Sequence, residues 1–368
     1  MITLGVLGTG DVAFRTYLPG LSVLRGRAAV VACADPISER ATQFAKEAQA
    51  ISGEPVMAYA TLEEMLAHAG LDAVLNLSPA PAHYVTTKQI LAAGKHCYEE
   101  KPIANSLEEG RELEALAKAN DVVLLCAPAP MASSRFRWLK ESVNELIGEP
   151  FLAIGRMANM GPAAWKEYAG DPSVFYTEMV GPMLDTGVYL FHTLTGLFGP
   201  AKRVVASGGI AIPERFVTIP ARYGEIINVS ANDLMMINLE WEDGRFGHVL
   251  SSFAVPRSTA PVLELHGPGG SIEVKDIPTW YDLAAPIDLL QIDNRNGAPH
   301  EQWQKMATPE VGPVRQPIQS GPLHFVDVLD GREDPILTPA HAIHVLEIIR
   351  SAGQSAREHR VVELETRF

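Results

Sequence analysis

The sequence predicts an α/β protein, with an N-terminal doubly wound parallel sheet followed by an α+β part built on a large, open, mainly antiparallel sheet. Two observations predict this class. Up to residue 126, short apolar strands alternate with helix-length segments, which is typical of a parallel sheet covered by helices. Beyond Pro128, strands predominate. We therefore expect one domain over residues 1–126 and a second over residues 127–368.

In the first half, each expected element is bounded by turn or cap signals. Strands are expected at 3–7, 30–34, 73–77, 96–98 and 122–125, and helices at 36–50 and 82–93. Two further helices begin with the capping patterns Thr61-x-x-Glu64 and Ser106-x-x-Glu109.

The second half is expected to form the open sheet. Its strands are predicted at 151–157, 201–207, 234–241, 246–253, 262–266 and 271–274. Ile237, Leu239 and Trp241 alternate with Asn238 and Glu240, so one face packs inside while the other is partly polar. That open face is a candidate surface for forming a homodimer or homotetramer.

The C-terminal region is expected to return to helix. A proline-rich loop is predicted over residues 309–322. Thr338-Pro339 then begins a long helix that ends near residue 355, because proline is favoured in the first helical turn.

Composition narrows the class of protein. A hydrophobic fraction of 47% with 20% charged residues is typical of a soluble globular chain, and 368 residues suffice for two cores. A net charge of −14 disfavours nucleic acid and anionic membranes as partners. Cys33, Cys97 and Cys126 lack metal-ligand spacing, so we expect buried thiols in a reducing cytoplasm and no metal site.

The strongest functional signal follows the first strand. Residues 8–13 read Gly8-Thr9-Gly10-Asp11-Val12-Ala13, a G-x-G-x-x-A pattern. In such a pattern the first glycine allows a tight turn, the second lets the backbone approach a pyrophosphate, and the small third residue lets the helix pack on the sheet. An ordinary glycine turn is the alternative, but the flanking strand and helix favour dinucleotide binding.

Asp35 ends the second strand, about 22 residues after Ala13, close to the spacing of a carboxylate that binds both ribose hydroxyls. Such a carboxylate repels a 2′-phosphate, so we expect NAD rather than NADP, with Arg40 nearby softening the rejection. Asp35 can also cap the helix that begins at Pro36, and the two roles are compatible.

Glu100-Lys101-Pro102 lies just beyond a predicted parallel strand, at the sheet edge where ligands bind. A lysine there can hold a hydroxyl or carbonyl oxygen and stabilise alkoxide character while hydride leaves. The alternative is a lysine exposed in a charged loop.

A second candidate group lies on a predicted helix near residues 181–192. At about 100° per residue, Asp185, Tyr189 and His192 share one face. Three proton-active groups on one face favour acid-base chemistry. Alternatively, Asp185 is a helix cap and the other two are satisfied polar residues at a helix-sheet seam.

These motifs together resemble the Gfo/Idh/MocA oxidoreductases. The fingerprint, the Ala93-Gly94-Lys95-His96 to Lys101-Pro102 segment and the Asp185-x-Gly187-x-Tyr189 helix occur in the family's order and spacing. The resemblance covers essentially the whole chain. It implies a Rossmann domain, a C-terminal open sheet, a nicotinamide cofactor and oxidation or reduction of a sugar or cyclitol.

The resemblance also implies residue roles. The family's catalytic lysine corresponds to Lys101, whose bond to Pro102 is expected to be cis, and its motif aspartate corresponds to Asp185. Tyr189 stands where many members have histidine, as in the tyrosine branch, and His192 replaces a frequent aspartate. The usual Thr-Pro-Asn before the motif histidine is Ser78-Pro79-Ala80 here. Together, the fingerprint and the resemblance place the cofactor contacts at Gly8, Thr9, Gly10, Asp11, Val12, Asp35, Arg40, Ser78, Pro79, His83, Glu100 and Lys101.

The expected reaction transfers hydride from a sugar or cyclitol carbinol to NAD. Lys101 stabilises the oxygen, Asp185 orients the substrate, and either Tyr189 or His192 takes the proton. Trp165 and Tyr176 are candidates for a wall against the sugar ring, although packing explains them equally well. Two other classes stay open: an NAD-dependent glycoside hydrolase with a transient redox step, and a non-catalytic cofactor-binding sensor.

Overall fold

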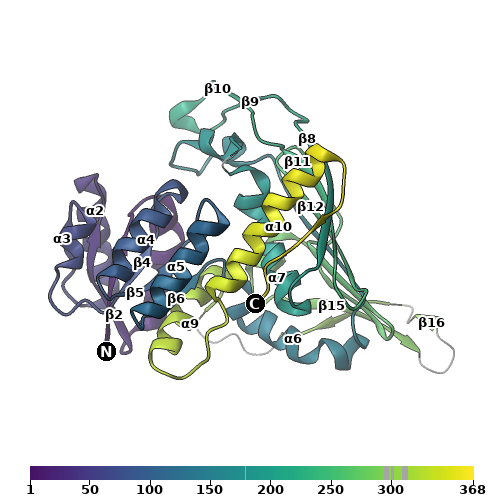
Figure 1. Ribbon diagram of the computed structural model, residues 1–368, viewed down its shortest axis with the longest axis horizontal. Coiled ribbons are helices and arrows are strands. Elements are labelled where there is room, and N and C mark those ends of the chain that lie inside the picture. Colours follow the sequence, from purple (N-terminus) through teal and green to yellow (C-terminus); the bar gives the residue numbers. More distant parts are fainter. Residues whose placement is uncertain (179, 294–297, 300–301, 309–313) are drawn as a thin grey trace. The chain divides into compact units, whose positions relative to one another are not determined.

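The computed structural model describes residues 1–178, 180–293, 298–299, 302–308 and 314–368. The chain forms two compact units (Figure 1). The first unit combines Met1–Ala132 with Gln316–Leu346, and the second combines Ser133–Arg315 with Glu347–Phe368.

The first unit is built on a six-stranded sheet of order β3-β2-β1-β4-β5-β6, in which every strand pair is parallel. The strands are β1 (Ile2–Leu7), β2 (Ala28–Ala34), β3 (Met57–Tyr59), β4 (Ala73–Asn76), β5 (His96–Glu99) and β6 (Leu124–Cys126). The chain runs outward from β1 to β3 and then returns to β4 on the other side of β1. This reversal creates a switch point at the carboxyl ends of β1 and β4, where open α/β sheets bind ligands.

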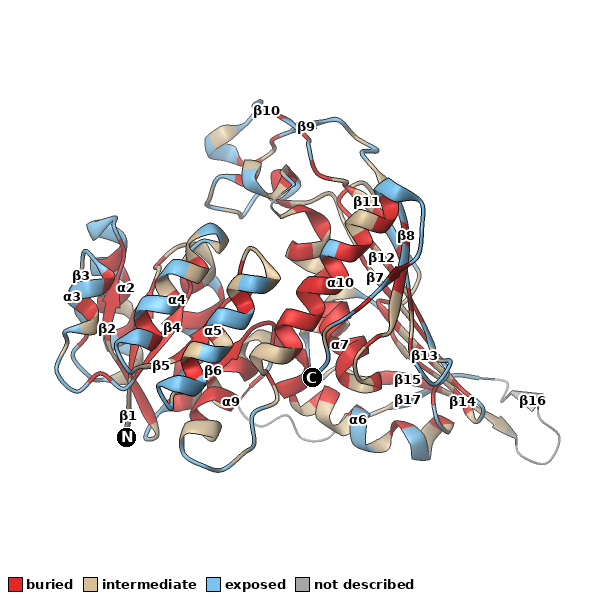
Figure 2. Ribbon diagram, viewed as in Figure 1, coloured by how far each residue is buried: buried red, intermediate tan, exposed pale blue. Residues whose placement is uncertain are grey.

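Helices connect these strands, as the sequence predicted. They are α2 (Ser38–Ser52), α3 (Leu62–Leu66), α4 (His83–Ala92) and α5 (Leu107–Ala119). The capping box at Thr61 and Glu64 is confirmed, since each side chain accepts a backbone N–H of the other residue. Ser106 likewise accepts the N–H of Glu109 at the start of α5. Figure 2 shows the resulting pattern, with mainly buried strands and helices that are exposed along one side.

The segment after the first glycine turn is not a regular α-helix. Residues Ala13–Tyr17 form a π-helical turn, followed by α1 (Leu18–Gly20) and the 3₁₀ turn Leu21–Leu24. A π-helical turn widens the helix locally and is frequent at functional sites.

Residues far along the chain complete the first unit. Helix α9 (Ser320–Leu329) lies there, with Phe325 packed 6.0 Å from the ring of Tyr98. The backbone N–H of Cys126 in β6 donates to the carbonyl of Leu337 at 3.0 Å. The loop predicted over residues 309–322 extends too far, because α9 already begins at Ser320. Residues 309–313 of that loop lie outside the described part of the chain.

The second unit is built on a ten-stranded sheet whose path is β16-β15-β14-β13-β7-β12-β11-β8-β18, with β17 paired to β15. Its pairs are antiparallel except β7 with β12. The strands are β7 (Leu152–Ala158), β8 (Arg203–Gly209), β11 (Leu234–Glu240), β12 (Phe246–Ser252), β13 (Leu263–Gly267), β14 (Gly270–Val274), β15 (Ile287–Asp293), β16 (Ala298–Pro299), β17 (Gln304–Met306) and β18 (Val362–Glu363). The mixed, mostly antiparallel sheet confirms the predicted class.

One face of this sheet is covered by α7 (Val188–Phe198). Leu190 of α7 lies against Gly155 of β7, and at the start of the helix Gly187 lies against Ser251 of β12, where added side chains would collide. Ile237 and Leu239 of β11 are buried, whereas Asn238 is exposed. The predicted alternation is therefore confirmed.

The second unit also contains helices and a small separate sheet. Helices α6 (Ser134–Ile147) and α8 (Ile277–Tyr281) lie in this unit, and α10 (Pro339–Glu358) begins in the first unit and ends in the second. A separate two-stranded sheet pairs β9 (Glu214–Phe216) with β10 (Ile226–Asn228). Among the described residues, no helix is both long and apolar enough to cross a membrane.

Candidate active site

The glycine turn after β1 has the geometry that a dinucleotide needs. Gly8 has a φ of +85°, and a Cβ at this position would lie 2.7 Å from the carbonyl oxygen of Leu77. Only glycine fits there without displacing the backbone of the neighbouring strand. Gly10 differs, because a Cβ at this position would meet nothing within 4 Å. The backbone at Gly10 therefore borders open space into which a pyrophosphate can approach.

Asp35 connects this turn to the end of β2. Its Oδ2 accepts the backbone N–H of Thr9 at 2.8 Å, and its Oδ1 accepts that of Ile37 at 2.9 Å. The side chain is only 6% exposed. Helix α2 begins later than expected, at Ser38 with Ile37 as its cap, so Asp35 acts on the turn before the helix rather than as the predicted cap. Each carboxylate oxygen retains a lone pair that can accept a ribose hydroxyl.

The other predicted cofactor residues of this edge are more exposed. Asp11 forms a 2.9 Å ion pair with Arg15, one turn along the helical segment, and Val12 is half-buried. Arg40 lies exposed in the first turn of α2. The cofactor contacts of Asp11, Val12 and Arg40 stay predictions.

Glu100 and Lys101 leave the carboxyl end of β5. Glu100 accepts the hydroxyl of Tyr17 at 2.5 Å and the backbone N–H of Lys101 at 3.0 Å. Burial, and secondly Glu100, raise the pKa of Tyr17 well above its usual value, so Tyr17 stays a neutral donor. Lys101 is partly exposed, and the predicted cis bond between Lys101 and Pro102 is confirmed. A second cis bond, Ala127-Pro128, was not predicted.

His83 joins the two loops of this edge. One ring nitrogen lies 2.6 Å from the carbonyl oxygen of Pro102 and the other lies 2.8 Å from that of Ser78. The Ser78 hydroxyl donates to Asn76 at 2.7 Å. The structure thus brings Ser78, Pro79 and His83 beside the Lys101-Pro102 turn, at the same sheet edge as the glycine turn.

Glu99, which was not predicted from the sequence, is completely buried at the end of β5. Its Oε1 accepts the hydroxyl of Thr87 at 2.8 Å, and Thr87 also accepts the side-chain amide of Asn76. The sequence does contain a sign of this residue, because Glu99 directly follows the predicted apolar strand. A charged group buried there needs a hydrogen-bonding or charged partner.

Asp185, Tyr189 and His192 lie on one continuous helical segment of the second unit. Asp185 belongs to a π-helical turn, Met183–Gly187, and the other two belong to α7. The regular spacing used to place all three on one face therefore does not apply across Asp185. Asp185 is partly exposed, Tyr189 is 7% exposed and His192 is 3% exposed. Lys101 belongs to the first unit and these three residues to the second.

The two aromatic candidates have different environments. Trp165 is 38% exposed, and its ring lies 5.9 Å from that of Tyr168. Tyr176 is completely buried; its hydroxyl accepts the N–H of Ala163 and donates to the carbonyl of Met160. The environment of Tyr176 supports the packing alternative, whereas Trp165 presents a surface to solvent.

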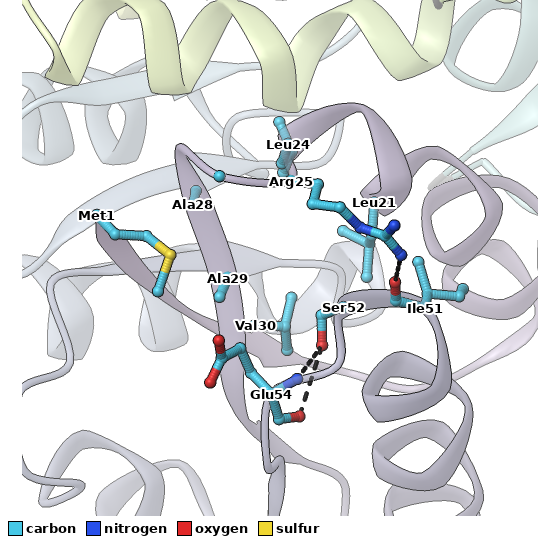
Figure 3. Close-up of a pocket in the computed structure, with 11 residues that line it drawn as sticks. Met1, Leu21, Leu24, Arg25, Ala28, Ala29, Val30, Ile51, Ser52 and Glu54 are labelled. Atoms are coloured by element: carbon cyan, nitrogen blue, oxygen red, sulfur yellow. Dashed lines mark hydrogen bonds between the residues drawn. The ribbon is translucent and has the colours of Figure 1, made fainter.

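A cavity of about 260 Å³ lies elsewhere in the first unit (Figure 3). Its lining is mostly apolar and includes Leu21, Leu24 and Ile51, with Met1 and Ala28 from the amino ends of β1 and β2. Gly8 and Asp35 follow the carboxyl ends of the same strands. The cavity is therefore separate from the predicted cofactor edge.

A parallel sheet with a glycine turn and a buried acid at its switch point defines a Rossmann-type dinucleotide-binding protein. Residues 2–127 match the family model described as "Oxidoreductase family, NAD-binding Rossmann fold", and residues 136–273 match that described as "GFO/IDH/MocA C-terminal domain". The chain belongs to the Gfo/Idh/MocA oxidoreductase family, as the resemblance indicated.

Individual relatives agree with this assignment. An uncharacterized oxidoreductase of Synechocystis is 31% identical over 65% of this chain and 62% of its own length. An NADP-dependent scyllo-inositol 2-dehydrogenase of Bacillus subtilis is 30% identical over 46% of this chain and 51% of its own length. This chain therefore spans less than two thirds of either relative.

A solved structure supports the fold. The crystal structure of a putative NADPH-dependent oxidoreductase from Desulfitobacterium hafniense matches this chain with a TM-score of 0.79 and 19% sequence identity, over 98% of this chain and 97% of that one. At this identity the likeness shows the fold alone.

Proposed function

We propose that the protein is an NAD-dependent oxidoreductase that transfers hydride between a carbinol carbon of a sugar or cyclitol and the nicotinamide ring. The observation that carries the proposal is the cofactor edge of the first unit, where Gly8, Gly10 and Asp35 have the geometry of a dinucleotide site. The named activity of the inositol dehydrogenase relative supports a polyhydroxylated ring as substrate.

The preference for NAD rests on the fixed carboxylate of Asp35. Two backbone N–H groups hold both of its oxygens, so it cannot turn away from a 2′-phosphate. A negative charge kept beside a phosphate disfavours NADP. Scyllo-inositol 2-dehydrogenases of Bacillus subtilis that use NADP and NAD are both among the relatives, so membership of the family does not fix the cofactor and the proposal rests on Asp35.

The proposed mechanism assigns each step to a residue of this chain. When bound, the nicotinamide supplies the hydride acceptor. Lys101 holds the reacting oxygen and stabilises its developing negative charge. Tyr189 takes the hydroxyl proton, with His192 as the alternative acceptor, and Asp185 orients the substrate. A free tyrosine has a pKa near 10, so a neighbouring positive charge must favour the phenolate for proton transfer near neutral pH.

A substrate screen tests this function. The purified protein is incubated with NAD and a panel of aldoses, sugar acids, cyclitols and glycosides, while NADH formation and sugar release are followed together. NADH formation with a sugar or cyclitol supports the proposal. Release of sugar without net NADH would identify the hydrolase class instead, and cofactor binding without turnover of any substrate would identify a sensor.

We further propose that the open face of the second sheet is covered by another copy of the chain. Val205, Met236 and Phe246 are each at least 40% exposed and lie on the same face of neighbouring strands. Exposed apolar side chains on a broad sheet are typical of a subunit interface.

A further inference from the structure

His83, the first residue of α4, makes two contacts that a neutral ring cannot both satisfy. It is 1% exposed, with Nδ1 2.6 Å from the carbonyl oxygen of Pro102 and Nε2 2.8 Å from that of Ser78. Carbonyl oxygens only accept hydrogen bonds, and a neutral imidazole has one N–H. His96 differs, because its Nδ1 accepts the backbone N–H of Val123 at 2.9 Å and must be unprotonated. The surroundings of His83 call for a proton on both nitrogens.

Glu99 presents the complementary problem. It is completely buried, and within the described part of the chain its Oε2 has no hydrogen-bond partner. Its Oε1 accepts the Thr87 hydroxyl and lies 3.9 Å from His83 Nδ1. A buried carboxylate is costly unless a cation lies close to it, and the His83 ring is close enough to supply one.

We propose that one proton is held by His83 rather than by Glu99, so that a buried imidazolium-carboxylate pair ties the end of β4 to the Lys101-Pro102 turn. The proton moves from the Glu99 carboxyl to the ring, and the pair as a whole stays neutral. Both ring N–H groups then donate, one to Ser78 and one to Pro102. His83 is thereby a positioning residue, because it fixes the backbone from which Lys101 projects.

The electrostatic surroundings explain why the two groups must act together. Burial is the largest influence on both groups: it holds the pKa of His83 below its usual value and that of Glu99 well above its usual value, so burial by itself favours the neutral form of each. The carbonyls of Pro102 and Ser78, and then Glu100, raise the pKa of His83, whereas Lys101 lowers it. Ionising both partners at once satisfies the two carbonyls and gives Glu99 a counter-charge.

The direct test is nitrogen NMR of the wild-type protein labelled with ¹⁵N in its histidines, at about pH 8, where an ordinary histidine has lost its second proton. We expect both His83 nitrogens to be protonated, while Nδ1 of His96 in the same spectrum is not. Loss of signals in His83→Gln assigns them. An unprotonated nitrogen in His83 would overturn the proposal, and this result requires neither a substrate nor an active enzyme.

The isosteric variant Glu99→Gln tests the pair and its role. It keeps the side-chain volume and an acceptor for Thr87 but cannot carry charge. We expect His83 to lose its second proton, and kcat to fall by about ten- to hundredfold with NAD affinity within a fewfold, because Lys101 is displaced. The matched control is Glu333→Gln, beside the buried His324 of the same unit, which should leave the His83 signals and kcat unchanged.

The outcomes separate the inference from the proposed function on which its catalytic part rests. Unchanged His83 signals in Glu99→Gln would overturn the pair. Changed signals with unchanged kcat would overturn the positioning role. A doubly protonated His83 in a wild-type protein that oxidises no carbinol would establish the pair and contradict the proposed function.

Discussion

Asp35 holds the glycine turn through the backbone N–H of Thr9, and we propose that the same carboxylate selects NAD. Replacing it by serine removes the charge and one acceptor, so we expect the ratio of NADP to NAD affinity to rise at least about tenfold, or ~1.4 kcal/mol. The variant should also lose about 1–3 kcal/mol of stability, because the buried N–H of Thr9 loses its acceptor. Calorimetric titration with both cofactors and denaturant unfolding measure the two effects.

The control is Glu39→Ser, which removes an exposed acid in the first turn of α2. It should change neither the affinity ratio nor the stability appreciably. Equal affinity of the wild-type protein for the two cofactors would contradict the role given to Asp35.

The sequence allowed candidate residues with a local signature to be predicted. Gly8 and Asp35 were identifiable because their spacing follows from one turn and one strand. The relation between His83 and Glu99 was not, because 16 positions separate them in the chain. Their approach depends on how β4, β5 and α4 pack, and no local pattern encodes it. Tyr176 also needed the structure, since burial alone separates a packing tyrosine from one that faces a substrate.

Strands β13, β14 and β15 place three carboxyl groups side by side. Glu264 is paired with Glu273, and Glu273 is paired with Asp288. Burial, and secondly Glu264, raise the pKa of Glu273, and Lys275 only partly opposes this. A carboxyl group whose pKa is higher in the folded than in the unfolded state costs stability once the pH rises above its unfolded pKa.

We therefore expect Glu273→Gln to raise the melting temperature at pH 7, with the gain vanishing below about pH 4, where the unfolded-state carboxyl is also protonated. Thermal unfolding across this pH range measures the effect. Glu264→Gln is the comparison, because it breaks the ion pair with Arg156 and should give no gain at pH 7. A lower melting temperature for Glu273→Gln at pH 7 would contradict the prediction.

Among the helices and strands, the sequence predicted those features that depend on residue type and on the spacing of apolar residues. The capping box at Thr61 and the alternation in β11 followed from side-chain chemistry and the two-residue repeat of a strand. The two π-helical turns did not, because no residue type signals an i to i+5 hydrogen bond. Helix α9 was partly missed because Pro317 and Pro322 read as loop, although proline is tolerated in a first helical turn.

At the scale of the whole molecule, we expect the exposed face of the second sheet to form an interface with another copy of the chain. Light scattering at micromolar concentration should show a dimer or a tetramer. Met236→Glu places a charge on the exposed face and should shift the protein toward monomer, because a buried unpaired charge is costly at an interface. Tyr223→Glu is the control, since Tyr223 is 71% exposed but follows β9 outside this sheet. A wild-type protein that is only monomeric would refute the assembly.

We propose that Lys101 and Tyr189 act as one catalytic unit on the substrate. The most direct measurement is a double-mutant cycle on kcat/KM for NADH formation with Lys101→Ala, Tyr189→Phe and the double variant, with NAD affinity as the control. We expect each single change to lower the rate at least about a hundredfold, and the double change to lower it no more than a fewfold further. If Tyr189→Phe keeps activity near wild type and His192→Ala loses it, His192 rather than Tyr189 is the proton acceptor, and the rest of the mechanism stands. Near-normal turnover in Lys101→Ala, or losses that multiply in the double variant, would contradict the account.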